Sequence, residues 1–278
     1  MLRFEEAGFG YGEGAVIDGL SFSLGRGEFA ALLGENGAGK STVCRLCNGL
    51  LKPRRGRVLL AGQDTRQVRI SVLARRVGYL FQNPDRQLCK NTVGEEILFG
   101  LDFVLEGPQR EREKEKKRRL EEMLDLFHLD GGRDPFSLSQ GERQQTALAS
   151  VLARKPEFLI LDEPTTGLDS RECTAIMEII SDLNSRGATV LMITHDMEVA
   201  ADYARRALVL SRGRLAGDGP VREIMGNREL LGAASLLPAQ IPALARLLAP
   251  PLSGAFTVEE MLEICIKMAR PAGKGEES

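Results

Sequence analysis

Apolar residues along the chain fall into short runs that glycine and charged residues separate. Several of these runs are almost continuously apolar: residues 29–33, 77–81, 158–161, 190–193 and 208–210. Strands that helices cover on both faces show this pattern, because neither face meets water. We therefore predict a parallel α/β sheet built from these runs.

Two shorter runs near the start of the chain, at residues 20–24 and 57–60, predict strands of a smaller antiparallel sheet. Glycine-containing turns such as residues 25–27 punctuate them. The pattern changes between about residues 92 and 135. There the stretch 106–130 is densely charged and then amphipathic, with apolar residues at helical spacing. We predict an inserted helical subdomain whose mixed charges form a solvated face rather than a basic binding patch.

A leucine- and proline-containing segment follows this part of the chain and ends in a helical pattern at residues 258–269. Residues 271–278 continue no such pattern and predict a frayed end. The sequence therefore predicts an α/β domain over residues 1–225, into which the helical part is inserted. A small helical extension over residues 226–278 follows it.

Composition narrows the class of protein. Of the 278 residues, 43% are apolar and 27% are charged, which is typical of a globular protein with a sizeable core. The net charge of −2 provides no basic field for nucleic acid, which we exclude as a partner. The longest uncharged stretch, residues 230–245, contains two prolines and is shorter than the roughly 20 apolar residues of a membrane-spanning helix. We expect a soluble chain.

Cys44 and Cys47 form the only Cys-x-x-Cys spacing among the five cysteines. Such a pair can be a redox or metal site, or two small apolar residues along a helix. Because no second Cys or His pair follows to complete a zinc site, we favour the second interpretation. The odd number of cysteines fits a reducing cytoplasm.

A phosphate-binding loop follows the predicted strand at residues 29–33 and precedes a helical stretch, in the pattern Gly-x-x-x-x-Gly-Lys-Ser. Its glycines allow consecutive N–H groups to turn toward phosphates, and the helix start adds the positive end of its dipole. Lys40 is expected to reach the β- and γ-phosphates, and the Ser41 hydroxyl to ligate Mg²⁺. The predicted nucleotide contacts are Gly34, Glu35, Asn36, Gly37, Ala38, Gly39, Lys40, Ser41 and Thr42.

Two carboxylates, Asp162 and Glu163, end the apolar run at 158–161. Consecutive side chains on a strand point to opposite faces, so the two acids are expected to have different roles. Asp162 is expected to hold Mg²⁺, and Glu163 to act as the base that polarises the attacking water. The alternative is that both acids cap the turn at Pro164.

Gln82 and His195 follow two other predicted strands in the same way. The Gln82 amide can contact both Mg²⁺ and the attacking water. His195 can touch the γ-phosphate and brace the water beside Glu163, although a histidine at a strand end is often an ordinary polar residue. Because ligands of α/β sheets bind at the carboxyl ends of the strands, we expect these residues to converge there.

A further segment, Leu-Ser-Gln-Gly-Glu at residues 138–142, makes the resemblance to a known family specific. The chain resembles the ATP-binding subunits of ABC transporters. It has that family's elements in the family's order: the phosphate loop, Gln82, the signature segment 138–142, Asp162-Glu163, Gly167-Leu168-Asp169 and His195. The resemblance implies a P-loop ATPase cassette over residues 1–225, with the helical subdomain at about 92–150, and ATP and Mg²⁺ as its ligands.

In that family two cassettes dimerise head to tail, each signature segment facing the other subunit's ATP. The resemblance implies that Ser139 and the Gly141 amide contact that γ-phosphate, that Gln140 lies in the interface, and that Asp169 links the two sites. It also places Tyr11 where an aromatic ring stacks on adenine. The signature departs from the commoner Leu-Ser-Gly-Gly-Gln at Gln140 and Glu142, and Glu142 adds a negative charge.

The segment Phe-Gln-Asn-Pro-Asp-Arg-Gln-Leu at residues 81–88, together with residues 92–96 and 99–100, is similar to the ATPases of energy-coupling-factor importers. These importers take up vitamins, cobalt and nickel. The similarity implies a transmembrane coupling subunit, a substrate-binding membrane subunit and a location at the cytoplasmic face of the membrane. It also implies a groove for the coupling subunit at about residues 82–103, and an extension, residues 226–278, that stabilises the dimer.

The apolar side chains expected in that groove, Leu88, Val93, Ile97 and Phe99, have the alternative interpretation of plain core. At the level of function, one alternative is an ABC importer or exporter of another type with the same cassette. A soluble ABC protein acting on ribosomes or DNA is a second alternative, and a cassette that binds ATP without turnover is a third.

Overall fold

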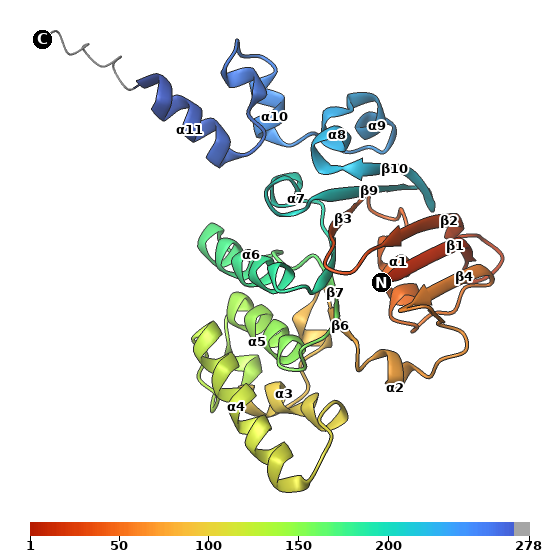
Figure 1. Ribbon diagram of the computed structural model, residues 1–278, viewed down its shortest axis with the longest axis vertical. Helices are drawn as coiled ribbons and strands as arrows, with labels where there is room; N and C mark the ends of the chain where they lie inside the picture. The colour runs from red at the N-terminus through yellow and green to blue at the C-terminus, as the bar shows by residue number, and fades with distance from the viewer. Residues whose placement is uncertain (270–278) are drawn as a thin grey trace, which may run out of the picture.

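The computed structural model describes residues 1–269, in which a six-stranded sheet forms the centre (Figure 1). Its strand order is β10-β9-β3-β8-β7-β6. All neighbouring strands are parallel except β10, which pairs antiparallel with β9 at one edge. The apolar runs predicted to form a parallel sheet do so. The strands are β3 (Phe29–Leu33), β6 (Val77–Leu80), β7 (Phe158–Asp162), β8 (Thr189–Ile193), β9 (Arg206–Ser211) and β10 (Arg214–Pro220).

A four-stranded sheet, in the order β2-β1-β4-β5, packs beside the central sheet on the side of α1 (Figure 1). The strands are β1 (Leu2–Phe9), β2 (Ile17–Leu24), β4 (Arg55–Leu60) and β5 (Gln63–Asp64), and the pairs are antiparallel. Sequence reasoning missed β1, because the consecutive Glu5 and Glu6 interrupt the alternation that Leu2 and Phe4 begin. Phe4 stacks on Phe22 of β2, with ring centroids 4.6 Å apart.

Every residue of β3, β7 and β8 is buried, and alternate residues serve two different cores. Ala30 and Leu32 of β3, with the residues level with them on β7 and β8, face the four-stranded sheet and α1. Ala31 and Leu33, with the residues level with them on β7 and β8, face the helices on the other side of the sheet. The helices before residue 205 are α1 (Lys40–Cys47), α2 (Ile70–Leu73), α3 (Val93–Phe99), α4 (Gln109–Phe127), α5 (Gln140–Leu152), α6 (Ser170–Ser185) and α7 (Met197–Tyr203).

Helices α3, α4 and α5 pack together at one end of the molecule (Figure 1), within the range where a helical subdomain is predicted. The limits of that subdomain stay a prediction. Cys44 and Cys47 are buried in α1 and are not disulfide-bonded, and burial raises the pKa of both thiols. They therefore lie along a helix as two small core residues.

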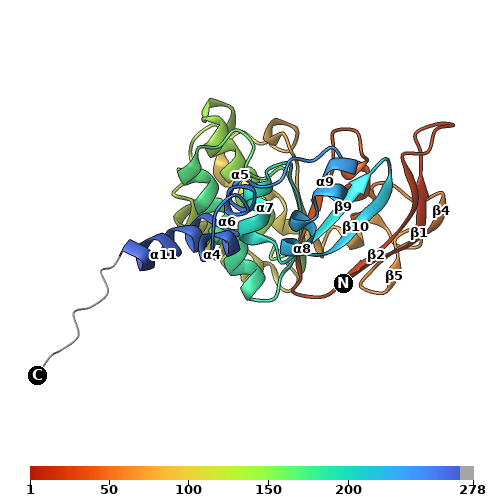
Figure 2. The same ribbon diagram turned by 90° about the horizontal axis from the view of Figure 1, so that it is seen from above.

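The C-terminal part adds α8 (Val221–Gly226), α9 (Arg228–Ala233), α10 (Gln240–Ala245) and α11 (Val258–Ala269). The main core continues into it through Leu231, Ala234 and Phe256. In contrast, α11 has no buried residue, and it projects outward in both views (Figure 1, Figure 2). No helix among residues 1–269 has both the length and the apolar character needed to cross a bilayer. The predicted end at 271–278 lies outside the described residues.

Gly78 of β6 generates a test of the packing between the central sheet and α5. A Cβ at this position would lie 2.6 Å from Val151 Cγ1 and 2.8 Å from Pro156 Cγ. We expect Gly78→Ala to lower the free energy of unfolding by about 1–3 kcal/mol, because overpacking forces neighbouring atoms apart. Equilibrium unfolding in urea measures this change.

Gly232→Ala in α9 is the matched control. A Cβ added at Gly232 would meet no other atom within 4 Å, and alanine favours a helix over glycine by about 1 kcal/mol. The control should therefore be as stable as the unchanged chain or slightly more stable. Equal stability of Gly78→Ala and the control would contradict the packing described here.

Candidate nucleotide-binding site

The turn between β3 and α1 forms the predicted phosphate loop. A Cβ at Gly34 would lie 2.4 Å from the Leu210 carbonyl oxygen, so the backbone approaches β9 as only glycine permits. Gly39 has a φ of 107°, and a Cβ there would lie 2.7 Å from Ile17 Cδ1. Both glycines are therefore required by the close packing of the loop on its neighbours.

Lys40 opens α1 and turns back over the loop. Its Nζ donates hydrogen bonds to the carbonyl oxygens of Gly34, at 2.6 Å, and Glu35, at 3.0 Å. The side chain is buried, and burial lowers the pKa of Lys40, while the carboxylates of Glu163 and Asp162 oppose that change. The ammonium group is thus held at the loop, close to two acids from another strand.

A cavity of about 290 Å³ joins the loop to the ends of β6 and β7. The predicted residues Gln82, Asp162 and Glu163 line it, opposite the phosphate loop. Glu35 and Ala38 do not line the cavity; the Glu35 carbonyl accepts from Lys40, and the Ala38 carbonyl accepts from Gly213 N–H. The lining residues are Val16, Asn36, Gly37, Gly39, Lys40, Ser41, Thr42, Gln82, Asp162 and Glu163.

Asp162 is the last residue of β7 and is buried. Burial raises its pKa, and a hydrogen bond from the Tyr79 hydroxyl to Oδ2, at 3.2 Å, counteracts that change. Tyr79 belongs to the neighbouring strand β6 and was missed by sequence reasoning. The sequence around Tyr79, between Gly78 and Leu80, does not indicate that the tyrosine contacts Asp162.

Glu163 leaves the strand with a φ of 54°, in the left-handed region that non-glycine residues rarely adopt. This conformation costs of the order of 1–3 kcal/mol and persists where the surroundings impose it. Here the Glu163 N–H donates to the Ile193 carbonyl oxygen of β8 at 2.8 Å. The turn aims the second acid at the cavity beside Asp162, and no hydrogen bond within residues 1–269 shows either side chain capping the turn at Pro164.

His195 follows β8 and lies with its Nδ1 2.7 Å from Glu163 Oε2. Its side chain is 68% exposed, so it contacts the acid from the solvent side. The next residue, Asp196, accepts hydrogen bonds from the N–H groups of Glu198 and Val199 and caps α7. The histidine is thereby fixed between a strand end and a helix start.

Tyr11 lies beyond the other side of the loop, between β1 and β2. Its side chain is exposed, and its hydroxyl oxygen lies 3.5 Å from Thr42 Oγ1. The Arg45 guanidinium donates to the same hydroxyl at 3.3 Å. The structure therefore places the predicted aromatic ring next to α1 at the rim of the phosphate loop, and adds Arg45, which sequence reasoning missed.

Ser139 begins α5 with a capping box. Its Oγ accepts from Glu142 N–H at 3.2 Å, and Glu142 Oε2 accepts from Ser139 N–H at 2.8 Å. The other oxygen of Glu142 pairs with Arg133 at 2.7 Å. The Ser139 N–H, and then Arg133, lower the pKa of Glu142. The carboxylate of Glu142, which replaces the glutamine of the commoner signature, is therefore paired within the chain. The Ser-x-x-Glu spacing is a signal in the sequence for this cap.

The signature segment packs directly on the start of α6. A Cβ at Gly167 would lie 2.1 Å from Gln140 Nε2, and one at Gly141 would lie 2.2 Å from Glu172 Oε1. Asp169 and Glu172 form a second capping box. Ser139, Gln140 and Asp169 thus lie beside one another around the buried Gly141, and none of the four lines the cavity at the phosphate loop.

Comparison with known proteins agrees with this geometry. The family model described as ABC transporter matches residues 17–166. The energy-coupling factor transporter ATP-binding protein EcfA of Methanothermobacter thermautotrophicus is 37% identical, over 95% of this chain and 84% of its own length. The EcfA of Methanocaldococcus jannaschii is 36% identical, over 94% of this chain and 95% of its own length.

Some relatives are longer. The match to an ABC transporter ATP-binding protein of Caldanaerobacter subterraneus, at 40% identity, covers 96% of this chain but only 46% of that protein. It likewise spans well under half of two relatives from Methanosarcina, at 36% and 41% of their lengths.

Solved structures share the fold. CbiO1 of Clostridium perfringens, part of the CbiONQ ABC transporter complex, matches with a TM-score of 0.73 and 31% identity, over 88% of this chain and 97% of that one. A dimeric ATP-binding cassette in a post-hydrolysis state with ADP and Pi matches with a TM-score of 0.71 and 28% identity, over 80% and 99%.

The capping box at Ser139 generates a stability test. We expect Glu142→Ala to lower the free energy of unfolding by about 1 kcal/mol, because it removes one half of the box. Glu142→Gln keeps a side-chain acceptor for the Ser139 N–H and should lower the free energy of unfolding by less than Glu142→Ala does. Urea unfolding of the three proteins at pH 7 measures the difference.

The same effect has a pH dependence of known sign. A carboxylate with a lowered pKa stabilises the fold above its unfolded pKa, about 4.3, and this stabilisation is lost as the pH falls through the folded pKa. The difference between the unchanged chain and Glu142→Ala should therefore shrink below about pH 4. A difference that grows on acidification would contradict the assigned hydrogen bonds.

Proposed function

This chain belongs to the ABC transporter family as an ATP-binding protein, and from that premise we propose that it hydrolyses ATP as a head-to-tail dimer to power an energy-coupling-factor type importer. The observation that carries the proposal is the meeting of Lys40, Asp162 and Glu163 at one cavity, with His195 on the second acid. The same elements occur in order in the sequence, and EcfA relatives match nearly the whole chain.

Magnesium fits the side chains of the cavity. Ser41, Gln82 and Asp162 line it and provide a hydroxyl, an amide oxygen and a carboxylate, the hard oxygen ligands that Mg²⁺ prefers. These side chains would hold Mg²⁺ beside the phosphate loop, where the ion would supply positive charge against the charge that develops on the phosphates. Tyr79 orients the Asp162 carboxylate from the neighbouring strand.

Glu163 is the proposed general base. His195 occupies its Oε2, whereas Oε1 accepts no hydrogen bond from residues 1–269 and can take a proton from a water molecule. The strained turn at Glu163 holds the carboxylate at the cavity, so little reorganisation is needed when the water attacks the γ-phosphorus. His195 would keep the carboxylate oriented through its contact with Oε2, and its exposed side chain would contact the γ-phosphate.

The separation of the two surfaces supports the head-to-tail dimer. Ser139 and Asp169 lie at helix starts, where N–H groups favour anions, yet they lie away from their own chain's phosphate loop. A second cassette, identical or related, would bring this surface on to the bound ATP. The matching cassette with ADP and Pi is a dimer.

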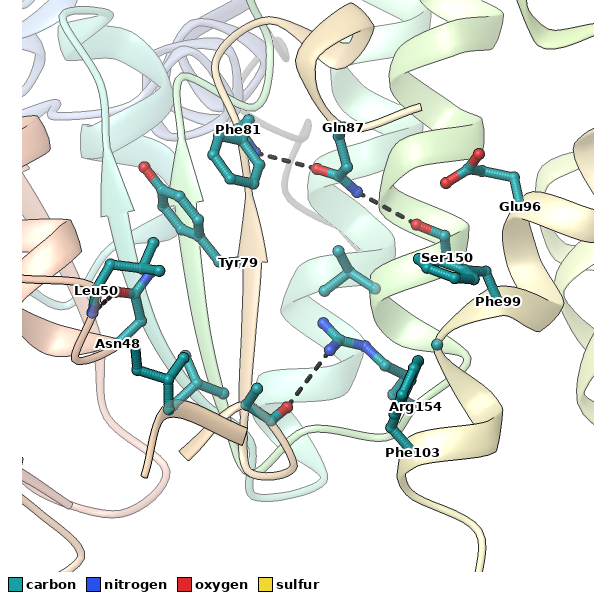
Figure 3. A pocket seen from close by; sticks show the side chains of 15 residues that line it. Asn48, Leu50, Tyr79, Phe81, Gln87, Glu96, Phe99, Phe103, Ser150 and Arg154 are labelled. Atoms are coloured by element: carbon teal, nitrogen blue, oxygen red, sulfur yellow. Dashed lines mark hydrogen bonds between the residues drawn. The ribbon is translucent and has the colours of Figure 1, made fainter. Parts of the chain in front are cut away.

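The proposed contact with a transmembrane coupling subunit is a groove of about 310 Å³ between α3, α5 and β6 (Figure 3). Leu88, Val93 and Ile97 are core residues, so the plain-core interpretation holds for them. Phe99 and Phe103 are 45% and 64% exposed and offer an apolar surface to a partner. We call this cavity the Phe99 groove.

The extension offers a second apolar surface. Val258, Leu262 and Ile266 of α11 are exposed, at spacings that place them on one helical face. A second cassette that covers this face would explain its composition and would stabilise the dimer. The chain would then act at the cytoplasmic face of the membrane, beside a coupling subunit and a substrate-binding membrane subunit.

The importer type is tested on the assembled complex. Mass spectrometry of the detergent-solubilised complex from native membranes should show a coupling subunit and a small substrate-binding membrane protein. Membrane subunits that work with a separate soluble binding protein, or those of an exporter, would favour the alternative of another ABC transporter type with the same ATPase chemistry.

The role of Glu163 generates a kinetic prediction. We expect Glu163→Gln to lower kcat by about 100-fold or more, because the amide cannot accept the proton of the attacking water. Binding of ATP and formation of the closed dimer should persist, as measured by nucleotide titration and light scattering. Glu157→Gln changes the same group at the opposite end of β7, where it pairs with Arg76, and should leave kcat unchanged. Unchanged ATPase activity in Glu163→Gln would contradict the assignment of Glu163 as the general base.

The role of Lys40 generates a binding prediction. We expect Lys40→Ala to raise the Kd for ATP by about tenfold or more, because a charge-assisted contact with the phosphates is lost. Isothermal titration calorimetry measures the affinity directly. Lys117→Ala, on the exposed face of α4, is the control. Equal ATP affinity in Lys40→Ala and Lys117→Ala would contradict the proposed phosphate contact.

A further inference from the structure

Gln144 is a buried polar side chain on α5 that the proposed mechanism does not use. It is 1% exposed and does not line the nucleotide cavity. Its Nε2 donates a hydrogen bond to the Pro164 carbonyl oxygen at 3.1 Å, in the interior of the protein. Pro164 directly follows Glu163, the proposed general base. The hydrogen bond therefore joins α5 to the turn that carries the reacting acid.

This turn depends on Gln144 for the partner of one carbonyl group. The Thr166 N–H closes the turn by donating to the Glu163 carbonyl oxygen at 3.2 Å. The Pro164 carbonyl lies between these two residues, and among residues 1–269 it accepts a hydrogen bond only from Gln144. A buried carbonyl that loses its partner costs free energy, so the turn has a reason to stay against α5.

Glu163 is restrained from three separate elements. Its N–H donates to the Ile193 carbonyl oxygen of β8, and His195 contacts its Oε2. Gln144 adds the third restraint, one residue further along the chain. Because Glu163 has a φ of 54°, its conformation persists only while such neighbours impose it.

A second glutamine places α5 against the same segment. Gln140 and Gln144 are four residues apart, so they lie on one face of the helix. The Gln140 amide occupies the space beside Gly167, where a Cβ would lie 2.1 Å from Nε2. One face of α5 therefore contacts the chain after Glu163 at two points, and this helix begins at Ser139.

We infer that Gln144 is a positioning residue for ATP hydrolysis, whose hydrogen bond to Pro164 holds Glu163 at the nucleotide cavity. The inference rests on the proposed function and adds a residue to its mechanism. Without the Gln144 donor the strained turn relaxes, and the carboxylate leaves the position from which it accepts the proton of the attacking water. Binding of ATP does not depend on Gln144, because the phosphate loop lies on the opposite side of the cavity.

ATP hydrolysis by the full chain tests the inference, after purification from native membranes with the subunits that accompany it. Gln144→Met removes the donor and keeps a side chain of similar length. We expect kcat to fall by about tenfold, because a small displacement of the base slows proton transfer. Gln145→Met makes the same change at the next position, which is only partly buried and lies outside the cavity, and should leave kcat unchanged.

Calorimetric titration separates positioning from binding. The Kd for ATP should be the same in Gln144→Met as in the unchanged chain, within about twofold, because the phosphate contacts are intact. A rise in Kd as large as the fall in kcat would show a general loss of the site and would overturn the inference. Unchanged kcat in Gln144→Met would also overturn it.

The same substitution in the Glu163→Gln background provides the sharper test. If Gln144 acts through Glu163, Gln144→Met should lower the residual rate of Glu163→Gln by less than about twofold, since the acid that it positions is already absent. A further tenfold loss in this background would mean that Gln144 acts independently of Glu163, and the inference would be wrong.

Circular-dichroism melting verifies the fold of each variant. Should Gln144→Met fail to fold, Gln144→Asn takes its place in both backgrounds with the same expected and contrary outcomes. It keeps the amide but shortens the side chain by one methylene group. Absence of ATPase activity in the unchanged chain would remove the proposed function, whereas equal activity of an active unchanged chain and Gln144→Met would remove only the role of Gln144.

Discussion

The burial of β3, β7 and β8 on both faces is the constraint on which the site depends. Polar groups inside these strands would lose water without finding partners, so reactive side chains can stand only where the strands end. Because the strands are parallel and adjacent, their carboxyl ends open on one edge of the sheet. The phosphate loop, the acidic pair and His195 meet there for that reason.

Contacts between two glycines and neighbouring side chains organise the second surface. Gly141 and Gly167 leave no space for a Cβ, because side chains from the opposite segment occupy it. Two capping boxes then fix the starts of α5 and α6 beside each other. The Gln140 and Glu172 side chains thereby bring the two segments into contact, and a proposed link between two ATP sites requires such a contact.

The molecule also carries surfaces that residues 1–269 leave uncovered. Helix α3, which carries Phe99, and helix α11 lie at opposite ends of the fold (Figure 1), and neither the Phe99 groove nor α11 contributes to the nucleotide cavity. In the proposed function they serve different partners, a membrane subunit and a second cassette. Their separation allows one chain to contact both at once.

The sequence by itself determined the parallel strands, the phosphate loop and the family, because continuous apolar runs and short motifs are local signals. It did not reveal β1, where the consecutive Glu5 and Glu6 interrupt the alternation. Only the tertiary structure decided which polar groups meet: Tyr79 with Asp162, Arg133 with Glu142, and Gln144 with the carbonyl group of Pro164. These contacts join residues that no local pattern connects, so they depend on how strands and helices pack in space.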